Sequence, residues 1–163
     1  RAPFLQHSNA SFNVLHQSGF AYDSSVTENL AGLSSQTNGY IWPYTFDNLH
    51  AQSYDVGTAP AQTYNGLWEI PMYSFYENAA PAASMDYPGN YDDLLTMFKA
   101  GFNQRAATNK APLGLYFHSA WFNSEAHVNA LNDFLIWALA QEGTWVVTNQ
   151  QLIACLDERP APY

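Results

Sequence analysis

The sequence predicts an α/β fold, because short apolar strands alternate with amphipathic helices along the chain. Residues 19–22 (GFAY) and 113–117 (LGLYF) are continuous apolar runs of strand length. Residues 91–105 and 124–141 carry apolar side chains at helical spacing. Buried strands that alternate with helices in this way indicate a parallel sheet or a barrel.

The first half of the chain predicts one helix and one strand before a long irregular stretch. Residues 8–18 open with polar capping residues and end at Gly19, which favours a short helix. The strand at 19–22 follows, with Asp23 at its carboxyl end. Residues 29–66 combine Gly, Asn, Ser, Gln and Pro with scattered aromatics, and they predict a long excursion of the kind that is often functional in compact domains.

The second half predicts a more regular alternation of elements. A strand at 67–75 is interrupted by Pro71, and residues 78–90 predict a loop. The helix at 91–105 and the strand at 113–117 come next. The remaining elements are a helix at 124–141, a strand at 144–148 and a helix at 149–156.

Length and charge limit the class of protein. The 163 residues predict one domain, residues 1–163, and five Lys and Arg against fourteen Asp and Glu give a formal charge of −9. This charge disfavours nucleic acid and anionic membranes as partners, and no apolar run of about 20 residues is present to span a membrane. A charged fraction of 12% among many neutral polar residues is typical of secreted proteins. The single cysteine, Cys155, excludes an intrachain disulfide and is predicted to be a buried thiol.

Aromatic residues are abundant, with eleven Tyr, ten Phe and five Trp. Flat apolar rings stack on the C–H faces of sugars, so one interpretation is a carbohydrate site lined by aromatics. The other is an aromatic core.

His118 is the best placed candidate for chemistry, because it follows directly after the apolar run 113–117. In parallel α/β folds, functional groups gather at the carboxyl ends of strands. Asp23 and Glu69 lie at similar positions in the predicted strands. A histidine there can transfer a proton, although a histidine hydrogen-bonded into the core would fit the same pattern.

Several other chemistries find no support in the sequence. The five histidines form no H-x-x-x-H pair, and one cysteine cannot build a thiolate metal site. No G-x-S-x-G, P-loop or G-x-G-x-x-G motif is present. Asn9-Ala10-Ser11 is a candidate N-glycosylation sequon.

A series of motifs then occurs in one order: RAPF (1–4), GFAYDSS (19–25), WPYTFD (42–47), GLWEIPM (66–72), APLGLYFHSAWF (111–122) and VVTNQQLI (146–153). This order resembles the C-terminal half of the catalytic domain of animal-type chitin deacetylases, members of the polysaccharide deacetylase family (carbohydrate esterase family 4). The similarity runs from residue 1 to about residue 156. The resemblance implies that 1–163 is a partial domain, the C-terminal portion of a distorted (β/α) barrel. It also implies metal-dependent removal of acetyl groups from N-acetylglucosamine polymers such as chitin, usually with zinc.

The resemblance implies roles for individual residues. His118 matches the general acid of the last family motif, and Arg1 matches the arginine that holds the catalytic aspartate. Asp23 matches the acidic position that orients the histidine. Residues expected to line the substrate side are Phe4, Trp68, Tyr116 and Trp121.

The chain also departs from the family pattern. The family's T-F-D-D stretch and H-x-x-H motif, which carry the catalytic base and the metal ligands, precede R-x-P-F. The only T-F-D here is Thr45-Phe46-Asp47, which lies after it. We therefore expect the chain to be catalytically incomplete and to bind no metal alone. The family's disulfide loops are also without cysteine here.

Three hypotheses follow. The chain is the C-terminal half of a complete secreted deacetylase, whose N-terminal half lies in the same or another chain. Alternatively, it is a non-catalytic extracellular protein that binds carbohydrate or has a structural role. A third hypothesis is a half-barrel that assembles with a partner or a second copy through its open edges.

Overall fold

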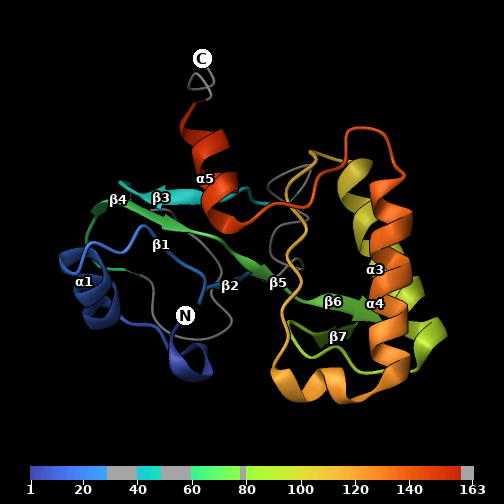
Figure 1. Cartoon of the computed structure of the whole chain (residues 1–163). Coiled ribbons are helices and arrows are strands. Elements are labelled where there is room, and N and C mark those ends of the chain that lie inside the picture. Colours follow the sequence, from blue (N-terminus) through green and yellow to red (C-terminus); the bar gives the residue numbers. More distant parts are fainter. Residues whose placement is uncertain (29–39, 49–59, 78–79, 159–163) are drawn as a thin grey trace.

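The computed structural model describes residues 1–28, 40–48, 60–77 and 80–158 (Figure 1). The helices are α1 (Asn9–Gln17), α3 (Tyr91–Ala106), α4 (Glu125–Leu139) and α5 (Asn149–Asp157), with 3₁₀ turns η1 (Pro3–Leu5) and η2 (Ser119–Asn123). The strands are β1 (Tyr22–Asp23), β2 (Thr27–Glu28), β3 (Tyr44–Phe46), β4 (Tyr64–Glu69), β5 (Met72–Tyr73), β6 (Phe75–Glu77) and β7 (Ala80–Ala83). The predicted α/β class is confirmed.

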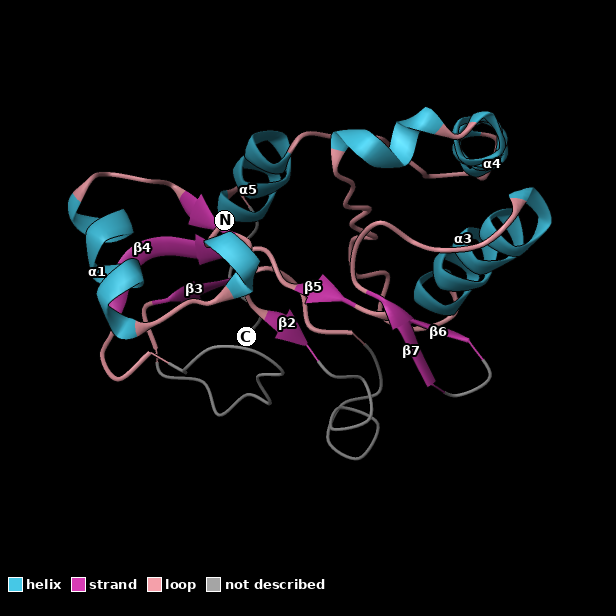
Figure 2. Cartoon of the chain, turned by 90° about the horizontal axis from the view of Figure 1, so that it is seen from below, coloured by secondary structure: helices cyan, strands magenta, loops and turns pink. Residues whose placement is uncertain are grey.

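Two groups of elements lie side by side (Figure 2). One contains α1 and a three-stranded sheet in the order β1-β4-β3, where β1 runs parallel and β3 antiparallel to β4. The other contains α3, α4 and the antiparallel pair β6-β7. The short parallel pair β2-β5 lies between them (Figure 2).

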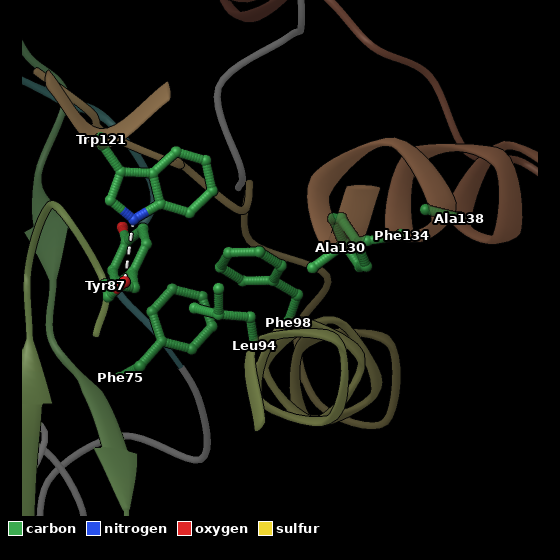
Figure 3. Close-up of a cluster of buried hydrophobic side chains, with 8 residues drawn as sticks. All are labelled: Phe75, Tyr87, Leu94, Phe98, Trp121, Ala130, Phe134 and Ala138. Atoms are coloured by element: carbon green, nitrogen blue, oxygen red, sulfur yellow. Dashed lines mark hydrogen bonds between the residues drawn. The ribbon is translucent and has the colours of Figure 1, made fainter. Parts of the chain in front are cut away.

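Each group has its own aromatic core. Below the first sheet, the buried residues are Phe12, Val26, Phe46, Tyr64 and Leu67. The second core joins α3 and α4 to β6 and η2 through Phe75, Tyr87, Leu94, Phe98, Trp121, Ala130, Phe134 and Ala138 (Figure 3). Most of the aromatic surplus whose surroundings are described is therefore core, where edge-to-face ring pairs add to the hydrophobic effect.

A glycine permits the close packing of α3 on β6. A Cβ at Gly101 would lie 2.2 Å from Cε1 of Phe75, closer than two carbon atoms can approach. Phe75 is buried, so its ring has little room to move. The sequence pattern identified the helix, but it gave no sign of this contact.

The four predicted helices are confirmed as α1, α3, α4 and α5, with ends that differ by at most two residues. Their capping chemistry explains why they begin where they do. Ser8, Asn90 and Thr148 each accept a hydrogen bond from the backbone N–H three residues later and complete a capping box. Ser124 caps α4 in the same way, without the reciprocal bond.

The strand predictions at 113–117 and 144–148 are wrong for the described residues, because neither run joins a sheet. Among the described residues, residues 113–117 receive a single backbone–backbone hydrogen bond, which the Asp86 N–H donates to Tyr116 O at 3.0 Å. A strand requires a neighbour along its length, whatever its propensity. The described strands also form small open sheets, so a barrel stays a prediction.

Other differences are local. The strand predicted at 19–22 is β1, which lies later and includes Asp23. The loops predicted at 29–66 and 78–90 contain β3 and β7, although parts of both lie outside the described residues. Cys155 is exposed rather than buried, because α5 buries Ile153 and a residue two positions later points to the opposite side.

No helix among the described residues has both the length and the apolar character needed to cross a bilayer.

Candidate active site

His118 lies where the extended segment from residue 112 turns into η2. It is the N-terminal flanking residue of that turn, with extended backbone angles (φ −86°, ψ 158°). Its side chain is 71% exposed, so the ring is not a core histidine. Of the two interpretations of His118, a histidine available for proton transfer fits this position, and a histidine hydrogen-bonded into the core does not.

Asp86 holds His118 through both carboxylate oxygens. Oδ1 accepts a hydrogen bond from the His118 backbone N–H at 2.6 Å, and Oδ2 pairs with the His118 Nδ1. The Asp86 backbone N–H also donates to Tyr116 O at 3.0 Å. Asp86 can do this because its backbone is left-handed (φ 50°), a conformation that aspartate tolerates better than most residues.

The electrostatics of this pair fix the orientation of the ring. Burial by itself raises the pKa of Asp86, but hydrogen bonds from the His118 side chain and backbone lower it by more, and the net shift is downward. An ionised carboxylate only accepts hydrogen bonds, so Nδ1 must carry the proton. Within the described residues Nε2 has no hydrogen-bond partner, which leaves it available to an incoming ligand.

This shift predicts a pH-dependent contribution to stability. In the folded protein the pKa of Asp86 lies below its ordinary value of 3.8. The ionised carboxylate therefore stabilises the fold above that value, and the contribution is lost as pH falls through the folded-state pKa. We expect Asp86→Asn to lower the denaturation midpoint at neutral pH, and the two proteins to converge as the pH falls below 3.8 and through the folded-state pKa of Asp86. Asp157→Asn, an exposed site on α5, is the control, and a gap that persists in acid would contradict the assignment.

Arg1 contacts the same segment at Tyr116, two residues before His118. Its Nε donates to Ser24 O at 2.8 Å, and its guanidinium carbon lies 4.4 Å from the centroid of the Tyr116 ring. The backbone N–H of Ala2 donates to Ser25 Oγ at 2.7 Å. The two hydrogen bonds, from Arg1 to Ser24 and from Ala2 to Ser25, tie residues 1 and 2 to the residues that follow β1.

Asp23 lies beside Ser24 and Ser25, the residues that Arg1 and Ala2 contact, and not beside His118. It is 2% exposed, and its carboxylate accepts from Ser25 N (3.1 Å) and Ser25 Oγ (2.9 Å). Of the two carboxylates, the structure brings Asp86 to the histidine.

The four aromatic residues expected at the substrate side lie in different surroundings. Phe4 is 93% exposed in η1, whereas Trp68 is half-buried in β4 opposite Tyr22 and Thr45. Tyr116 is half-buried beneath Arg1. Only the Phe4 ring offers an open face.

Trp121 is part of the core described above. It is 6% exposed, and its Nε1 donates to Tyr87 O at 2.8 Å (Figure 3). Phe117 and His127 pack against its ring, with centroids 4.2 and 4.6 Å away. Its position makes it a support of the turn that carries His118.

Asn9 is the first residue of α1, and its side-chain oxygen is already engaged. It accepts hydrogen bonds from Ala61 N at 3.1 Å and from Tyr64 Oη at 2.7 Å. Glycosylation at Asn9 stays a prediction.

Across the described segments, no group of three His, Cys, Asp or Glu side chains is placed to hold an ion. The residues that the structure describes therefore do not make a zinc site.

Asp86 is the functional residue that sequence reasoning missed. The stretch MDYPGN (85–90) carries turn signals, and the loop at 78–90 was predicted from them. Spacing along the sequence cannot show that an aspartate in such a loop meets a histidine 32 residues later. The sequence signal for Asp86 is its place directly before Tyr87, an aromatic residue that anchors the loop in the core.

Comparison with known proteins places this geometry in context. Chitin deacetylase 1 of Bombyx mori is 28% identical to the chain over 151 residues, which are 84% of this chain and 26% of that protein. Chitin deacetylase 8 of Bombyx mori is 28% identical over 166 residues, covering 90% of this chain and 42% of that protein. No protein-family model matches the chain. The similarities support a chitin deacetylase-like relationship over most of the chain, which spans less than half the length of either relative.

Proposed function

We propose that this chain contributes the proton-donating wall of the active site of a chitin deacetylase. The observation that carries the proposal is the exposed His118 ring, whose Nδ1 is bound by Asp86 while Nε2 is left available. Both matched relatives are chitin deacetylases, and the similarity covers most of this chain. The substrate would be the N-acetylglucosamine units of chitin or a related polymer.

In the proposed reaction, water adds to the acetyl carbonyl and the C–N bond breaks. Acetate leaves with the oxygen from water, and the sugar nitrogen receives a proton from Nε2 of His118. Asp86 stabilises the imidazolium that exists before this transfer and keeps the ring aimed at the nitrogen. The groups that activate water, with zinc as the expected ion of the complete domain, would come from another part of the full-length protein.

We also propose where this chain lies in the full-length protein. The chain would be the C-terminal half of the catalytic domain in the polysaccharide deacetylase family, secreted to where chitin is found. The chain covers 26% and 42% of the two relatives, which supports a match to part of a longer protein. The C-terminal placement rests on the order of the motifs in the sequence.

The test is acetate release by the full-length protein from N-acetylglucosamine oligomers and from chitin. We expect acetate and free amine in equal amounts, with a rate that depends on the protonation of the His118 imidazole. Binding to chitin with no acetate at any pH would overturn the proposal. That result would favour the alternative, an extracellular chitin-binding protein, for which the exposed Phe4 ring offers a stacking surface.

A further inference from the structure

We propose that Tyr116 is a positioning residue, which holds the segment carrying His118 against Arg1 and thereby sets the direction of the imidazole. The inference rests on the proposed function, because it concerns the same histidine. It differs from the sequence expectation, in which Tyr116 touches the substrate directly.

The tyrosine ring is held from the side of the chain start. The Arg1 guanidinium lies over the ring face at 4.4 Å, while its Nε is fixed by Ser24 O at 2.8 Å. A guanidinium that is both hydrogen-bonded and stacked has little freedom, and a partly desolvated cation–π contact is stronger than an exposed one. The Ser24 side chain is in turn fixed by its hydrogen bond to Ile70 O at 2.8 Å. The ring thus packs against an anchored arginine.

The tyrosine backbone is held from the other side, by the residue that also holds His118. Asp86 donates its N–H to Tyr116 O and accepts the His118 backbone N–H at 2.6 Å. Tyr116 and His118 are two residues apart, so in an extended segment their side chains share a face. A shift of the tyrosine ring therefore moves the segment at the point where the histidine is attached.

Gly114 shows how closely the ring is fitted. A Cβ at this glycine would lie 2.4 Å from the Tyr116 hydroxyl oxygen and 2.7 Å from its Cζ. The ring lies back along the segment over Gly114, so residues 114 and 116 share a face. The substitution Gly114→Ala is therefore expected to displace the Tyr116 ring while Arg1 and His118 themselves remain unsubstituted.

The experiment compares Tyr116→Leu, Tyr116→Phe and Gly114→Ala in the full-length protein, with Tyr91→Leu as the matched control. Tyr91 is also a half-buried tyrosine, but it bonds Asp133 on α4. We expect Tyr116→Leu and Gly114→Ala to lower kcat by about tenfold to a hundredfold and to shift the pH profile of kcat. Tyr116→Phe keeps the stacked ring and loses the hydroxyl, which bonds the Ser24 side chain, so it should stay within about threefold of wild type. A rise in KM with kcat and its pH profile unchanged would show a substrate contact and overturn the inference.

A second readout separates this inference from the proposed function. The imidazole signals of His118, followed by NMR during a pH titration, do not require turnover. We expect Tyr116→Leu and Gly114→Ala to move these signals and Tyr91→Leu to leave them in place. Should Tyr116→Leu fail to fold, Arg1→Gln removes the same contact from the half-exposed side and must produce the same shift. Signals unchanged in all of these variants would refute the inference, whereas absent acetate release in wild type would refute the function alone.

Discussion

His118→Gln is expected to lower acetate release by about a hundredfold to ten-thousandfold, the range that a positioned acid contributes. Glutamine keeps a polar side chain of similar length but cannot deliver a proton to the leaving amine. Because the His118 side chain is 71% exposed, its replacement should leave the fold intact. The measurement is kcat on N-acetylglucosamine oligomers, with the denaturation midpoint recorded beside it.

His16→Gln is the control for this prediction. His16 is also exposed, and its Nε2 lies 3.1 Å from Asn65 O. It belongs to α1, which lies on the opposite side of the molecule from α4 (Figure 1). We expect it to leave kcat unchanged. Equal activity of His118→Gln and wild type, with both folded, would remove His118 from the mechanism.

The sequence was most informative where chemistry and local structure coincide. His118 stood out because a polar residue ended the apolar run 113–117, and the structure places it at an exposed turn. The helices could be predicted because capping residues such as Ser8 and Asn90 act within a few residues of the apolar pattern they precede. Both signals depend on neighbours along the chain.

Properties that depend on distant partners could not be predicted. The run 113–117 has the composition of a strand but lacks a ladder partner among the described residues. From the sequence Trp121 resembles a surface aromatic beside the candidate histidine, yet Tyr87 and Phe117 enclose it. The partner of the histidine was chosen from motif order as Asp23, whereas loop geometry brings Asp86. Each difference comes from packing between segments, which periodicity does not describe.

Arg105→Ala is expected to lower the free energy of unfolding by about 3 kcal/mol, because it removes a buried cation together with its hydrogen bonds. Arg105 is 6% exposed near the end of α3. Its Nε donates to Pro112 O at 3.2 Å and its Nη1 to Gly101 O at 3.1 Å. The guanidinium also lies 3.9 Å from the Tyr40 ring centroid and 5.5 Å from that of Tyr73.

These contacts make Arg105 the link between α3, β5 and the start of the segment that ends at His118. Burial lowers its pKa, but an arginine stays protonated at neutral pH, so the charge must be balanced by the surrounding carbonyls and rings. Alanine would leave the Pro112 carbonyl without this donor and open a cavity beneath Tyr40. Arg105→Lys keeps the charge but loses the planar fork and the stacking, so we expect it to recover less than half of the loss.

Chemical denaturation at neutral pH measures the effect. Lys99→Ala on the same helix is the matched control, since its Nζ lies 5.1 Å from the Trp137 ring at a partly exposed site and its loss should cost at most about 1 kcal/mol. A cost for Arg105→Ala no larger than that of Lys99→Ala would mean that the rings and carbonyls around Arg105 close over the gap. The segment leading to His118 would then be held mainly by Asp86, Arg1 and the packing of Phe117 on Trp121, and the variant should retain the activity of the wild type.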